Sequence, residues 1–141
     1  MRKALVIAPH ADDETLGMGG TIARLASEGW SVKVAVLTGH GPGKHPIWSR
    51  EVWDRIRGEA KNACDLLGVD ELIFDDLPAS CLDRHPTHEI NAAVANLLDR
   101  IEPEAVYIPF VHDLHGDHYA VAYAAQVACR PYRNPGVRML A

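Results

Sequence analysis

Three features that are scarce in this chain of 141 residues each exclude a class of protein. The three cysteines, Cys64, Cys81 and Cys129, are widely spaced, so they form no Cys-x-x-Cys zinc or redox unit and cannot all pair within the chain. We therefore expect a reducing, cytoplasmic setting. Apolar runs are short: none approaches the roughly 20 residues of a membrane span, and the run behind Met1 is too short for a secretory signal.

Clustered positive charge is also lacking. The formal net charge is −5, and cationic side chains gather only in the stretch Arg50–Lys61, where acidic residues interrupt them. Because binding to nucleic acid requires clustered lysines and arginines, we expect no nucleic-acid partner. A hydrophobic content of 48% and a charged content of 23% are typical of a globular protein. The length corresponds to a single domain over residues 1–141.

Short apolar runs alternate with stretches of helical periodicity along the chain. The first run, Ala4–Ala8, is continuous, as in a strand that is buried on both faces of a parallel sheet. The alternation predicts an α/β fold, a Rossmann-like three-layer sandwich with a mostly parallel sheet and helices on both faces. Strands are expected at Ala4–Ala8, Ser31–Thr38, Glu71–Phe74 and Ala105–Pro109, and helices at Leu16–Glu28, Arg50–Leu67, Thr87–Ile101 and Asp117–Cys129.

Two clusters of histidines and acids each follow an expected strand. The segment His10–Glu14, with three consecutive carboxylates, follows the first strand, and the segment His112–His118 follows the strand Ala105–Pro109. Three adjacent acids repel one another unless a helix N-terminus, hydrogen bonds or a cation offsets their charge. In parallel α/β sheets, ligands bind at the carboxyl ends of the strands, where the strand order reverses. We therefore predict that these two strands are neighbours and that the clusters meet.

The two clusters together have the composition of a catalytic zinc site, which needs about three protein ligands and an open position for water. His10 and Asp13 with one histidine of the second cluster would supply the ligands. Asp12 would take a proton from the metal-bound water, and the other histidine would donate to an oxyanion on a substrate carbonyl. A single His or Asp before a helix is more often a cap, but two such clusters favour a metal site.

Two other patterns have structural interpretations. The spacing of Gly17–Gly20 does not match the Gly-x-Gly-x-x-Gly turn that binds nucleotides, and the preceding acids would repel a pyrophosphate. We expect these glycines to let the first helix pack closely on the sheet. Four other histidines are expected to be structural, although two of them lie in a Gly-rich loop that suits ligand contact. The four are His40 and His45, in that loop, and His85 and His88.

Four short motifs carry a resemblance to a known family. Pro9–Glu14 matches a His-Pro-Asp-Asp-Glu signature, with Ala11 where proline is usual, and His115–His118 matches a His-x-Asp-His signature. Arg57–Ala60 and Leu66–Val69 are similar to an Arg-x-x-Glu-Ala helix and its end. Together, over residues 4 to about 126, they resemble the LmbE-like (PIG-L type) zinc-dependent N-deacetylases.

The resemblance implies an enzyme that removes the acetyl group from an N-acetylated amino sugar of the N-acetylglucosamine type. The family's zinc ligands fall on three residues, His10, Asp13 and His118. Its general base falls on Asp12, and its carbonyl-polarising histidine falls on His115. In the implied mechanism a zinc-bound water, deprotonated by Asp12, attacks the amide carbonyl of this small-molecule substrate.

Neighbouring acids are given supporting roles by the same resemblance. Asp117 would orient an imidazole, as ligand histidines usually require, and Asp113 is a candidate for a similar part. Glu14 is expected to be a structural partner at the start of the helix. Family members are usually longer, so we expect the family's C-terminal segment to be lacking, and Val137–Ala141 has the pattern of a strand beginning.

Several alternatives stay open from the sequence. The chain could be a metal-dependent hydrolase of another bond, such as a phosphoester, or a non-catalytic module that binds a sugar or a metal. A set of two histidines and one carboxylate does not select zinc over iron, cobalt or manganese. The sequence does not identify the aglycone, and it leaves both a monomer and a homo-oligomer open.

Overall fold

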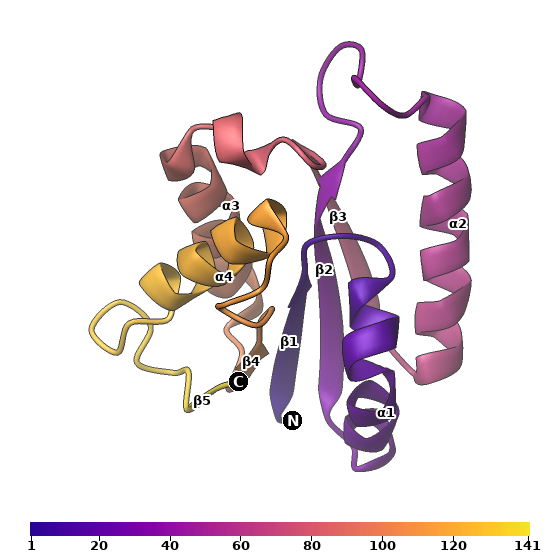
Figure 1. Cartoon of the computed structure of the whole chain (residues 1–141). Helices are drawn as coiled ribbons and strands as arrows, with labels where there is room; N and C mark the ends of the chain where they lie inside the picture. The colour runs from indigo at the N-terminus through magenta and orange to yellow at the C-terminus, as the bar shows by residue number, and fades with distance from the viewer.

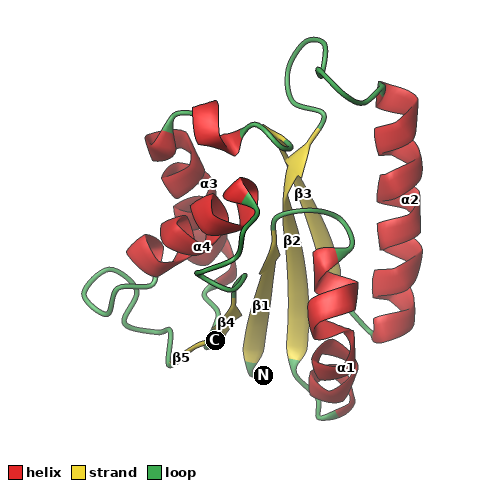
Figure 2. Ribbon diagram, in the orientation of Figure 1, coloured by secondary structure: helices red, strands yellow, loops and turns green.

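A computed structural model describes all 141 residues as a parallel sheet between two layers of helices (Figures 1 and 2). Each expected element is present, and the strand pattern at Val137–Ala141 corresponds to the short strand β5. The elements are β1 (Lys3–Ala8), α1 (Asp13–Ser27), β2 (Ser31–Gly39), α2 (Arg50–Leu67), β3 (Glu71–Pro78), the 3-10 turn η1 (Leu82–Arg84), α3 (Thr87–Ile101), β4 (Ala105–Tyr107), α4 (Gly116–Ala128) and β5 (Met139–Leu140).

The five strands are all parallel, in the order β3-β2-β1-β4-β5. Central β1 pairs with β2 on one side, with Ala4 opposite Val32, and with β4 on the other, with Ala4 opposite Ala105. The predicted pairing of the first strand with β4 is therefore confirmed. The strand order reverses between β1 and β4, which is the position where α/β sheets bind their ligands.

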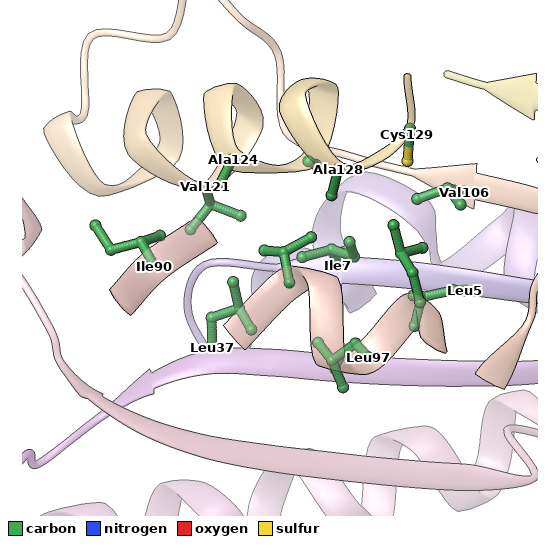
Figure 3. Close-up of a cluster of buried hydrophobic side chains, with 14 of the residues drawn as sticks. Leu5, Ile7, Leu37, Ile90, Leu97, Val106, Val121, Ala124, Ala128 and Cys129 are labelled. Atoms are coloured by element: carbon green, nitrogen blue, oxygen red, sulfur yellow. The ribbon is translucent and has the colours of Figure 1, made fainter. Parts of the chain in front are cut away.

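Two apolar cores, one on each face of the sheet, account for the continuous apolar run of β1. Leu5 and Ile7 face the core formed with α3 and α4, whereas Val6 and Ala8 face the core formed with α1 and α2. Figure 3 shows Leu5 and Ile7 among side chains from both helices of the first core. Because both faces of β1 are covered, no position along it needs a polar side chain.

Some details of the sequence interpretation are wrong. Helix α1 begins at Asp13 rather than Leu16, and Gly17–Gly20 lies inside it as expected. A Cβ atom at Gly17 or Gly20 would meet nothing within 4 Å, so close packing on the sheet does not require these glycines. Strand β3 extends past Phe74 to Pro78, with a register shift opposite Val36 and Thr38. Strand β4 ends at Tyr107 rather than Pro109. None of the helices has both the length and the apolar content needed to cross a membrane.

Candidate metal centre

Two loops meet at the carboxyl edge of the sheet, where β1 and β4 lie side by side. The β1–α1 loop (residues 9–12) leads into the helix at Asp13, and the β4–α4 loop (residues 108–115) leads into the helix at Gly116. The backbone N–H and the hydroxyl of Thr38 both donate to the carbonyl of Pro9, at 3.1 and 2.7 Å. The end of β2 therefore fixes the β1–α1 loop from its other side.

Three donor atoms from these loops and the first turns of α1 and α4 form a small triangle. His118 Nε2 lies 3.3 Å from His10 Nδ1 and 3.2 Å from Asp13 Oδ2, and the His10 Nδ1 to Asp13 Oδ2 distance is 3.4 Å. A tetrahedral zinc ion with bonds of about 2.0–2.1 Å holds its ligand atoms about 3.3–3.4 Å apart. The donor triangle therefore fits one face of such an ion and leaves the fourth position open.

Each histidine of the triangle is held by a carboxylate at its far ring nitrogen. His10 Nε2 lies 2.9 Å from Asp117 Oδ2, and His118 Nδ1 lies 3.1 Å from Asp113 Oδ2. Because an ionised carboxylate can only accept, each of these nitrogens carries the hydrogen. In the neutral rings the lone pairs are then on His10 Nδ1 and His118 Nε2, the two atoms that face each other. This is the tautomer that a metal ligand requires.

Asp117 is buried and fully engaged, with only 2% of its surface exposed. Besides the His10 contact, its Oδ2 accepts from the Ser80 N–H at 2.6 Å and its Oδ1 accepts from the Leu82 N–H at 3.1 Å. A second group of donor atoms combines Asp117 with His10 and His115. The existing hydrogen bonds of the Asp117 carboxylate make that group the weaker candidate for metal binding.

The carboxylates in and around the triangle, Asp13, Asp113 and Asp117, favour a positive charge there. Burial lowers the pKa of His10, but hydrogen bonds to Asp117 and Asp13 outweigh it and raise the pKa to about 9. Burial likewise opposes ionisation of Asp13, yet hydrogen bonds from His10 hold the pKa of Asp13 below its usual value. Either a proton on His10 or a divalent ion would supply the positive charge, and metal binding must displace the proton.

The His115 ring lies beside the triangle, and Asp12 directly precedes Asp13 in the chain. Asp12 is exposed at the N-cap of α1, and its side chain makes no capping hydrogen bond. The His115 ring is 4.7 Å from the ring of His10 and 5.1 Å from that of His118. His115 Nδ1 accepts from the Asp117 N–H at 3.2 Å, so the neutral ring carries its hydrogen on Nε2. That N–H is free to donate to a substrate oxygen.

Glu14 is separated from this chemistry by burial. Only 1% of its surface is exposed, the Thr15 hydroxyl donates to its Oε1 at 2.9 Å, and its Oε2 has no partner. Burial raises the pKa of this carboxyl.

A cavity of about 330 Å³ reaches the donor triangle, and Glu14 belongs to its wall. The cavity is lined by Asp13, His118 and Asp113 near the triangle, by Leu16 and Gly17 of α1, by Tyr107 at the end of β4, and by Phe110 in the loop that follows.

The other histidines lie outside both candidate metal groups. His85 Nε2 pairs with Glu89 at 2.9 Å, and His88 is exposed. His40 and His45 are buried in the Gly-rich loop.

The anchoring of Asp117 by Ser80 and Leu82 was not predictable from side-chain types, because only backbone N–H groups take part.

Comparison with known proteins agrees with this geometry. Residues 5–129 match the PIG-L family, whose description is GlcNAc-PI de-N-acetylase. The chain belongs to the PIG-L family. The Rossmann-like fold and the resemblance found in the sequence are thereby confirmed.

Two relatives show how much of a longer protein this chain matches. The chain is 30% identical, over 87% of its length, to a probable N-acetyl-alpha-D-glucosaminyl L-malate deacetylase 2 of Bacillus cereus, of which it covers 59%. It is 34% identical to the conserved protein TT1542 of Thermus thermophilus, with a TM-score of 0.76 and coverage of 91% of this chain and 55% of that one. The chain therefore spans little more than half the length of these relatives.

A third relative has a different named reaction. The crystal structure of GalB, the 4-carboxy-2-hydroxymuconate hydratase of Pseudomonas putida KT2440, matches 100% of this chain and 62% of its own, with 25% identity and a TM-score of 0.78. A hydratase adds water to a carbon–carbon double bond rather than hydrolysing an amide. Membership of this fold therefore does not by itself identify the reaction.

Proposed function

We propose that this protein is a zinc-dependent hydrolase that releases acetate from an N-acetylglucosamine conjugate. The observation that carries the proposal is the donor triangle of His10, Asp13 and His118, with Asp12 and His115 beside it. The names of the family and of the Bacillus relative share one chemical group, an N-acetylated glucosamine, and differ in what it is attached to. We therefore assign the sugar and leave the aglycone to experiment.

Two residues of the chain carry the proposed proton transfers and charge stabilisation. When bound, zinc would lower the pKa of a water molecule and polarise the amide carbonyl. Asp12 accepts a proton from the attacking water and returns it to the amine as the carbon–nitrogen bond breaks. His115 donates its Nε2 hydrogen to the carbonyl oxygen, where negative charge accumulates. Asp117 and Asp113 keep the two ligand imidazoles in their tautomers.

Hydrolysis of a phosphoester is less well supported. A two-metal phosphatase needs further carboxylate ligands, and the nearby spare acids, Asp113 and Asp117, are both engaged by imidazoles and backbone N–H groups.

Hydration of a double bond is the second candidate, because the Pseudomonas hydratase matches the whole chain. Its substrate would require the same acid–base pair but no amine leaving group.

Acetate release by the zinc-loaded protein tests the proposal. We expect zinc near one equivalent and turnover of N-acetylglucosamine conjugates that a chelator abolishes. Asp12→Asn should lower kcat by roughly 10²–10⁴-fold, as for loss of a general base, and retain the zinc. Asp54→Asn, at an exposed position of α2, is the matched control. Water addition to 4-carboxy-2-hydroxymuconate without acetate release from any conjugate would support the hydratase instead.

A further inference from the structure

His45 is a buried histidine of the β2–α2 loop (residues 40–49) that binds three backbone groups at once. Its Nδ1 accepts from the N–H groups of Ile47 and Trp48, at 3.2 and 3.1 Å, and its Nε2 donates to the Ala79 carbonyl at 2.9 Å. Only 4% of its surface is exposed, and its ring meets Trp53 edge-on at 6.0 Å. The loop is therefore tied to the end of β3 by a single imidazole.

The segment that His45 holds is also tied to the candidate metal centre. Ala79 precedes Ser80, whose N–H donates to Asp117, and Asp117 in turn holds His10. The N–H of Ala79 donates to the carbonyl of Gly39 at 3.1 Å, where β2 ends. A continuous series of hydrogen bonds therefore runs from a metal-ligand candidate, through Asp117 and Ala79, to the β2–α2 loop.

The β2–α2 loop has the position and the surface of a substrate wall. It rises from the carboxyl edge of the sheet, at the top of Figure 1, on the strand next to β1. Between this loop and the start of α2 lies a second cavity, of about 500 Å³, lined in part by His40, Lys44, Trp48 and Arg50. Trp48 is 45% exposed, so its indole ring is accessible to a ligand in this cavity.

We propose that His45 is a positioning residue that fixes the β2–α2 loop as the wall contacting the aglycone, the part of the conjugate beyond the acetylated sugar. This inference rests on the proposed deacetylase function. The metal centre and the 330 Å³ cavity handle the acetylated sugar, which all substrates share. The loop, through residues such as Trp48, distinguishes one conjugate from another, and His45 holds it in place.

Two substitutions separate the hydrogen bonds of His45. Asparagine can replace Nδ1 as the acceptor for Ile47 and Trp48 but does not reach Ala79, whereas glutamine can reach Ala79 but leaves the two N–H groups without an acceptor. His45→Asn and His45→Gln are compared with His88→Asn and His88→Gln, which alter an exposed histidine of α3. The substrates are the methyl glycoside of N-acetylglucosamine, which has a minimal aglycone, and the N-acetylglucosaminyl malate conjugate.

The result expected is a change in specificity rather than a general loss. Both His45 variants should raise KM for the malate conjugate about tenfold, with kcat and the zinc content nearly unchanged, because uniform binding is lost. For the methyl glycoside, kcat/KM should fall much less. Trypsin should cut native His45 variants faster after Lys44, in the same loop. Trp48→Ala, at an exposed position, should raise the same KM even if the His45 variants do not fold.

Different outcomes overturn the two proposals. If wild-type protein releases no acetate from either substrate, the deacetylase function fails, and the role of His45 in it fails too. If wild-type protein is active but the ratio of kcat/KM between the substrates is the same in Trp48→Ala and the folded His45 variants, only the inference about the loop fails. Equal losses on both substrates, with loss of zinc, would show that His45 has a structural role alone.

Discussion

The β1–α1 loop and the β2–α2 loop leave neighbouring strands at the same edge of the sheet but are held in different ways. Besides the hydrogen bonds from Thr38 to Pro9, the first is held by titratable side chains, with His10 against Asp117 and Asp13 against His118. The second is held by one neutral imidazole, that of His45, on backbone groups. The first arrangement therefore depends on protons and cations, whereas the second depends on the path of the chain.

The difference separates two tasks at the site: binding a positive charge and fixing the shape of a loop. Ion pairs and carboxylate-bound imidazoles create a strong local preference for a positive charge, which suits a centre that must bind a metal. Neutral hydrogen bonds to backbone groups carry no such preference and fix only shape. We therefore assign the proposed chemistry to the loops after β1 and β4, and the discrimination between substrates to the loop after β2.

His118→Ala should break the first loop system and leave the second intact. The substitution removes one of the three donor atoms, so we expect zinc content to fall close to zero and activity to fall at least about 10³-fold. Trypsin cleavage after Lys44 should be unchanged, because none of the hydrogen bonds of His45 involves His118. Elemental analysis and acetate release measure the effect, with His88→Ala as control. Retention of zinc by this variant would refute the donor triangle.

Asp117→Asn should weaken both loop systems, because Asp117 joins them. Its two oxygens accept from His10, Ser80 and Leu82, whereas asparagine has one acceptor oxygen and would turn an N–H group toward one of these donors. We expect zinc affinity to fall about 10–100-fold, as for loss of a residue that orients a ligand.

The same variant should speed trypsin cleavage after Lys44, which is already exposed, if the hydrogen-bonded path through Ala79 transmits the loss to the β2–α2 loop. Asp99→Asn, at an exposed position of α3, is the control for the removal of one charge. Zinc titration and proteolysis report separately on the two loops. A loss of zinc affinity with unchanged cleavage would show that the two systems are independent and that Asp117 serves the metal centre alone.

The meeting of the two clusters that form the candidate metal site could be predicted from the sequence, because side-chain types and strand patterns indicate it. A continuous apolar run places Ala4–Ala8 in the middle of a parallel sheet, and the rule for strand order then brings the two clusters together. The choice of His118 from the second cluster came from the family resemblance. Their carboxylate partners were also readable, since Asp113 and Asp117 belong to the same cluster.

The backbone contacts of Asp117, the start of α1 and the role of His45 could not be predicted, because they depend on backbone groups and on burial rather than on side-chain types. Ser80 and Leu82 contribute only N–H groups to Asp117, and their side chains give no signal of this. The start of α1 was misplaced because Asp13 and Glu14 have no apolar periodicity, although acidic residues in a first turn favour a helix. His45 lies in a Gly- and Pro-rich segment that is typical of a surface loop, and only the fold shows that its side chain is buried.

The smallest effect that we predict is a pH dependence of stability in the metal-free protein, which sharpens the contrast between a charged and a neutral loop. In the folded protein the pKa of His10 is raised from 6.5 to about 9. The stabilisation from protonated His10 is therefore complete below about pH 6.5 and is lost as the pH rises through about 9. We expect the Tm of metal-free protein to fall by several degrees over this interval.

Zinc should remove most of this dependence, because the metal takes the place of the proton. Burial raises the pKa of the Cys64 and Cys129 thiols from 9.0 to about 11, so their titration affects stability only near and above pH 9 and does not mimic the effect of His10. Metal-free His10→Asn, which has no titrating ring, should show a flat Tm between pH 6.5 and 8.5. An equal decline in this variant would mean that the charge between Asp13 and Asp117 does not come from His10.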